Sequence, residues 1–144
     1  MSERISTFRL YLMRAVYLLN FVGLGSIVWP AIINHKGTWD PLYGVAFCFW
    51  AALSALMGVG IRYPLQMLPL LFLQLFYKLV WLVAVGLPLW SAGQSTGGLT
   101  KTFIIGAIGD LIAIPWLYVL ANFVMKRGDR WRPVPKAVLS PSQP

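Results

Sequence analysis

The sequence predicts an all-α integral membrane protein with four transmembrane helices in an up-down antiparallel bundle. Composition is the first observation behind this fold class. Of the 144 residues, 58% are hydrophobic and only 11% are charged, and the mean hydropathy is +0.70. A soluble domain carries about 25% charged residues. This deficit indicates that much of the surface faces a bilayer instead of water.

The second observation is a set of four apolar segments, at about residues 10–33, 42–60, 65–90 and 102–125. Each is close to or above the ~20 residues with which a helix crosses ~30 Å of hydrocarbon. None alternates apolar and polar residues with period two, so strands are not expected. The connections are short, and short connections favour antiparallel neighbours. Residues 1–125 are therefore expected to form one transmembrane domain.

The first segment has Arg4 and Arg9 before it and Arg14 near its start, and it could be mistaken for a signal peptide. Its apolar run is too long for one and ends without a cleavage site of small residues, so a retained helix is predicted. The second segment ends at the tight turn 61–64, where the third begins. A glycine-rich loop at 91–101 precedes the fourth.

The distribution of Lys and Arg predicts the orientation. Nine of these residues lie before the first segment or near its start, in the turn 61–64, or after the fourth segment, all on one side of the predicted bundle. Only Lys36 and Lys101 lie on the other side, in or next to the two remaining loops. This asymmetry predicts an inner (plasma) membrane protein with both termini in the cytoplasm. The tail, residues 126–144, is basic and rich in proline. Anionic lipid headgroups are its expected partners, through Lys126, Arg127, Arg130 and Arg132.

Small residues at four-residue spacing predict close helix packing. Ser54 and Gly58 form one such pair, and Gly109 and Ala113 form another. Surfaces of this kind let two backbones approach each other within the membrane. They fit contacts within one chain, a homo-oligomer or a larger membrane complex.

Lys78 lies near the middle of the third segment, where an unpaired charge costs about 3 kcal/mol on insertion scales. Asp110 is the only carboxylate in any apolar segment. Counted along each helix, the two residues lie at about 20 and 22 Å from the cytoplasmic end. Their helices are sequence neighbours, and the small residues Gly106 and Ala113 share the face of Asp110. A buried Lys78–Asp110 ion pair is therefore predicted.

Other polar features lie close to this pair. Pro115 is expected to kink the fourth helix and to free the carbonyl of Leu111, which would create a cation or proton site beside Asp110. Asn20 and Gln74 lie at about 15 and 14 Å and are expected to hydrogen-bond to each other across the bundle.

No catalytic arrangement of residues is apparent, so the protein is not expected to be an enzyme. The single histidine, His35, has only Asp40 nearby in sequence, whereas metal sites use three or four ligands. No metal and no cofactor are expected. The net charge is +8, but the basic residues flank apolar segments and no nucleic-acid recognition motif accompanies them. Nucleic-acid binding is therefore not expected.

Three functions fit these features. The first is a non-catalytic membrane subunit or assembly partner in which Lys78–Asp110 is structural. The second is a small proton- or cation-coupled transporter that uses Asp110. The third is an accessory of a membrane enzyme that binds a lipid or quinone against Trp50 and Trp81.

Overall fold

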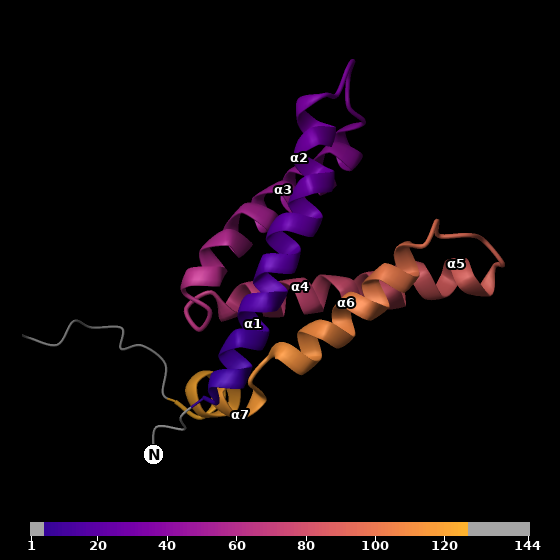
Figure 1. Ribbon diagram of the computed structural model, residues 1–144. Helices are drawn as coiled ribbons and strands as arrows, with labels where there is room; N and C mark the ends of the chain where they lie inside the picture. The colour runs from indigo at the N-terminus through magenta and orange to yellow at the C-terminus, as the bar shows by residue number, and fades with distance from the viewer. Residues whose placement is uncertain (1–4, 127–144) are drawn as a thin grey trace, which may run out of the picture.

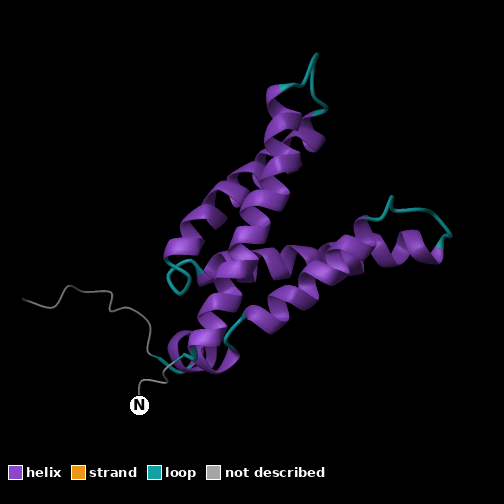
Figure 2. Cartoon of the chain, viewed as in Figure 1, coloured by secondary structure: helices purple, strands orange, loops and turns teal. Residues whose placement is uncertain are grey.

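The protein is all-helical over the residues that the computed structural model describes, 5–126, and no strand occurs among them (Figure 2). Four helical runs follow one another, three of them with a π-helical turn (η). The first run is α1 (Thr7–Leu19), η1 (Asn20–Leu24) and α2 (Gly25–Ile33), and the second is α3 (Pro41–Arg62). The third is α4 (Leu68–Trp81), η2 (Leu82–Gly86) and α5 (Leu87–Ser91). The last is α6 (Leu99–Ala113), α7 (Trp116–Val119) and η3 (Leu120–Val124).

Three of these runs are long and apolar enough to cross a membrane. They contain 27, 22 and 24 residues, which corresponds to about 40, 33 and 36 Å at the helical rise. The fourth run is broken, because Leu99–Ala113 and Trp116–Val124 meet at an angle of 68°. The count is therefore three candidate spans, or four if the bent pair forms one span. These lengths and this composition support a membrane protein.

Local chemistry explains where the helices begin. The Asp40 side chain caps α3 by accepting the Tyr43 N–H at 2.9 Å, and Pro41 occupies the first turn. Gly98 precedes α6 with φ +81°, a left-handed conformation that favours glycine. Hydropathy predicts that the third run begins at about residue 65. It begins at Leu68, because Pro64–Met67 form a turn.

The helices form two antiparallel hairpins (Figure 1). In the first, α1 and α2 pack against α3, and residues 34–40 form the loop. In the second, α4 and η2 lie beside α6, α5 extends beyond them, and residues 92–98 form the loop. Figure 1 shows the hairpins meeting near the start of α4 and diverging toward their loops. The antiparallel order expected within each pair is present, but the hairpins do not lie alongside each other over their full length.

Small residues of α3 receive aromatic side chains from the first run. A Cβ added to Gly58 would lie 2.9 Å from the Phe21 ring, and a Cβ added to Gly60 would meet the Tyr17 ring. One turn away, Trp29 Nε1 donates to Ser54 Oγ at 3.1 Å. The small residues of the second apolar segment therefore meet a neighbour within the same chain.

The core lies where the two hairpins meet. Tyr17, fully buried, donates its hydroxyl to the Pro64 carbonyl at 2.9 Å and so ties α1 to the turn before α4. Tyr17 belongs to a cluster of buried apolar side chains from α1, α3, α4, α6, α7 and the break after α6. The other members are Met13, Leu53, Met57, Leu68, Leu71, Leu75, Ala107, Ile114 and Val119.

Replacing Gly60 with alanine should lower the free energy of unfolding by about 1–3 kcal/mol, as is typical when a packed site is overfilled. The new methyl group would overlap the Tyr17 ring, which cannot move aside without losing the bond to Pro64. Thermal unfolding in detergent measures the effect. Gly23→Ala is the matched control, because nothing lies within 4 Å of its added Cβ. Equal melting temperatures for the two variants would contradict this close packing.

A buried polar cluster between α4 and α6

Lys78 on α4 and Asp110 on α6 form the single ion pair among residues 5–126. Lys78 Nζ lies 3.0 Å from Asp110 Oδ2, and the two residues are only 6% and 1% exposed. Gln74 Nε2 donates to the other carboxylate oxygen, Oδ1, at 3.2 Å. Both oxygens of Asp110 thus have a donor, so its charge is compensated inside the protein.

Helical spacing on both sides of the contact brings these groups together. Gln74 and Lys78 are four residues apart on α4, as are Gly106 and Asp110 on α6. The lysine stem lies directly on Gly106: an added Cβ there would be 2.7 Å from Lys78 Nζ and 3.1 Å from Cε. A glycine at position 106 is therefore what allows the ammonium group to reach Asp110.

Aromatic rings flank the pair toward the loop of the second hairpin. Trp81 packs edge-on against Phe103, with ring centroids 4.9 Å apart. Tyr77 contacts the same ring at 5.7 Å and also Phe49 of α3 at 5.7 Å. Trp50 packs on Phe47 of its own helix. The rings form an apolar surround in which an uncompensated charge would be costly.

The break after α6 differs from the simple proline kink that the sequence predicts. Ile114 is extended, and α7 begins only at Trp116. The carbonyl of Leu111 accepts a hydrogen bond from Trp116 Nε1 at 2.9 Å. The carbonyl expected to bind a cation or proton beside Asp110 thus has one protein donor, supplied by the residue after the proline, and keeps a second lone pair.

The 68° bend also changes the depth of Asp110. The nine residues after the break are about 14 Å long, but at this angle they add only about 5 Å along the axis of α6. With about 6 Å from the break to Asp110, the carboxylate lies about 11 Å above the end of η3, half the distance expected for a straight helix. Lys78, ten residues into α4, lies about 15 Å from its start.

Two other expectations have different outcomes. Asn20 does not reach Gln74; its Nδ2 donates to the Val16 carbonyl of its own helix at 2.8 Å. Because its side chain bonds to a backbone carbonyl one turn back in its own helix, Asn20 does not join the cluster. Gln74 Oε1 is buried without a hydrogen-bond partner. Lys126 is exposed, and Arg127, Arg130 and Arg132 lie outside the described residues.

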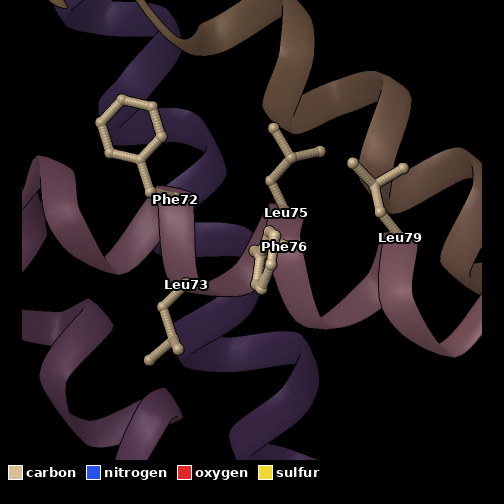
Figure 3. Close-up of a pocket in the computed structure, with 5 residues that line it drawn as sticks. All are labelled: Phe72, Leu73, Leu75, Phe76 and Leu79. Carbon is tan, nitrogen blue, oxygen red and sulfur yellow. The ribbon is translucent and has the colours of Figure 1, made fainter.

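A shallow apolar groove runs along α4 beside the cluster. It has a volume of about 350 Å³. Phe72, Leu75 and Leu79 point to one side of the helix, Leu73 points to the other, and Phe76 lies between them (Figure 3). Neither Lys78 nor Asp110 lines this groove. Within residues 5–126, no group of three or more His, Cys, Asp and Glu side chains is placed to hold a metal ion.

Gly106→Ala should displace the ammonium group of Lys78 from Asp110 and lower the melting temperature, because the new methyl group would lie 2.7 Å from Nζ, too close for the side chain to stay in place. Gly109→Ala is the control on the same helix, since nothing lies within 4 Å of its added Cβ. Thermal unfolding of both variants in detergent measures the difference. If Gly106→Ala melts no lower than Gly109→Ala, the lysine has another route to the carboxylate.

No protein-family model matches this chain, and neither the curated proteins nor the solved structures include one that is significantly similar to it.

Proposed function

We propose that this protein is a non-catalytic subunit or assembly partner of an inner-membrane complex, and that its Lys78–Asp110 pair fixes the register of α4 against α6. The observation that carries this proposal is the contact itself. The two charges are buried, 3.0 Å apart and neutralise each other. A charged residue in an ion pathway needs space or an exchangeable partner beside it. A residue that fixes the register of two helices needs only a permanent partner of opposite charge.

The surroundings of the pair support a structural role. Gln74 occupies the second carboxylate oxygen, and the Trp116 indole donates to the Leu111 carbonyl. The apolar groove on α4 leaves both charged residues out of its lining. The cluster is thus largely closed to a passing ion.

The proposed topology has four antiparallel spans with both termini in the cytoplasm. α6 alone is about 22 Å long, and the bent segment adds about 5 Å along its axis at 68°. The sum approaches the ~30 Å of a hydrocarbon core, so the bent pair serves as the fourth span. The excess of Lys and Arg at the ends away from the two loops supports this orientation.

Replacing one member of the pair by a neutral residue should destabilise the protein by about 3–5 kcal/mol, because the other charge is left buried without a partner. Lys78→Met and Asp110→Asn should therefore each reduce thermal stability and membrane abundance. The double variant should recover most of the loss, because both charges are then absent. Exchanging the two residues should recover part of it.

Lys101→Met is the matched control for these variants, because Lys101 is an exposed cation at the start of α6. Thermal unfolding and quantitative blotting of membrane fractions provide the measurements. A structural role is disproved if both single variants are as stable and abundant as the control.

One observation favours a second function, a small proton- or cation-coupled transporter that uses Asp110. Gln74 Oε1 is a buried acceptor without a partner beside the carboxylate, and a proton or hydrated cation would supply a donor or a charge to it. This function predicts ion uptake by proteoliposomes of the wild-type protein that is lost in the stable Lys78→Met/Asp110→Asn variant. Equal uptake by both, or by neither, rules the transporter out.

A reporter fused after Pro144 tests the topology. Alkaline phosphatase there should be inactive, because it folds only outside the cytoplasm, and a green fluorescent protein should fluoresce. The same reporters inserted at Gly37, in the loop before α3, should give the opposite pattern. Active phosphatase at the C-terminus would contradict an even number of spans with cytoplasmic ends.

A further inference from the structure

Arg9 lies at the break between α6 and α7 without a carboxylate partner in the described part of the chain. Its Nη1 donates to the Ile114 carbonyl at 3.4 Å, while a guanidinium has five N–H donors. Among residues 5–126 the two acidic side chains are engaged elsewhere: Asp110 pairs with Lys78, and Asp40 caps α3. A half-buried cation with spare donors therefore marks this end of the molecule.

The apolar groove of α4 begins close to the same break. Phe72, at one end of the groove, packs against Trp116 with ring centroids 6.1 Å apart and against Phe123 at 6.3 Å. Trp116 follows Ile114, to which Arg9 is bonded, by only two residues. The positive charge of Arg9 and one end of the apolar groove therefore lie at the same corner of the fold.

The groove is open to the outside of the fold. Phe76, at 68% exposure, and Leu73, at 43%, are exposed along it. From Phe72 to Leu79 the groove extends for about 10 Å along the helix, and every side chain that lines it is apolar.

We propose that this corner is a binding site for one anionic glycerophospholipid, with its phosphate on Arg9 and an acyl chain along Phe72, Leu75, Phe76 and Leu79. The planar guanidinium matches a phosphate with two parallel hydrogen bonds. The groove offers no hydrogen-bonding side chain, so it suits a hydrocarbon chain and would leave a polar ligand unpaired. The site requires only the contacts described here, and it stands whether Lys78–Asp110 is structural or part of an ion pathway.

The test is lipid retention by the purified full-length protein, measured by native mass spectrometry after incubation with phosphatidylglycerol or phosphatidylcholine of the same acyl composition. The wild-type protein should retain one phosphatidylglycerol in preference to phosphatidylcholine. Arg9→Gln should weaken this retention about tenfold. Arg14→Gln, which removes the same charge from the exposed face of α1, should have little effect.

The acyl-chain part of the site has its own pair of variants. Phe76→Asn should reduce retention of phosphatidylglycerol, whereas Val83→Asn, a side chain of 69% exposure outside the groove, should not. Arg9→Lys keeps the charge without the planar fork and should retain an intermediate amount, so it tests the site even if Arg9→Gln folds poorly.

Three results would overturn the proposal. Equal losses in Arg9→Gln and Arg14→Gln would indicate diffuse attraction to the basic surface. Equal losses in Phe76→Asn and Val83→Asn would show that the chain does not lie in the groove. Equal retention of phosphatidylcholine and phosphatidylglycerol by the wild-type protein would exclude recognition of the anionic headgroup.

Discussion

Two opposite charges lie side by side between α4 and α6, and the proposed function depends on this contact. In hydrocarbon each charge alone is costly, and the contact at 3.0 Å offsets part of that cost for both. A shift of either helix by one turn would move the groups ~5 Å apart and expose each to apolar side chains. In the role proposed here the pair selects a single register, which dispersion contacts between leucines would select only weakly. The aromatic contacts of Tyr77 and Trp81 with Phe103 follow from that register.

The two hairpins use the same device with different chemistry. In the first, glycines of α3 admit the rings of Tyr17 and Phe21; in the second, Gly106 admits the stem of Lys78. In each case a large side chain fills the space that a missing side chain leaves. Such pairing allows close approach of helices in a solvent that does not itself drive them together. It also accounts for the divergence of the hairpins, since these contacts are concentrated within each pair.

The sequence was sufficient for features that depend on composition and helical geometry. Hydropathy located the helical runs to within a few residues. Helix face and the adjacency of the two helices in sequence placed Lys78 opposite Asp110, with room at Gly106, although the depth counted for Asp110 was too large because of the bend. Hydrogen bonds that depend on which of several nearby donors and acceptors pair could not be predicted from the sequence. Trp116 was available to cap Leu111, and Asn20 had its own Val16 carbonyl within reach; neither preference has a signature in spacing. The size of the bend could not be predicted either. Pro115 requires a break in the helix but does not set its angle, and the contacts of Phe72 with Trp116 and Phe123 are tertiary contacts that the sequence does not reveal.

The separation of Lys78 and Asp110 along the chain, 32 residues, has a consequence for biosynthesis. Chain growth delivers the cation first, so Lys78 leaves the ribosome before Asp110. Release of α4 into lipid at that moment would leave the ammonium group without its partner, at a cost of about 3 kcal/mol. Entry of α4 together with α6 avoids this cost, so joint insertion of the second hairpin is more favourable than insertion of α4 alone.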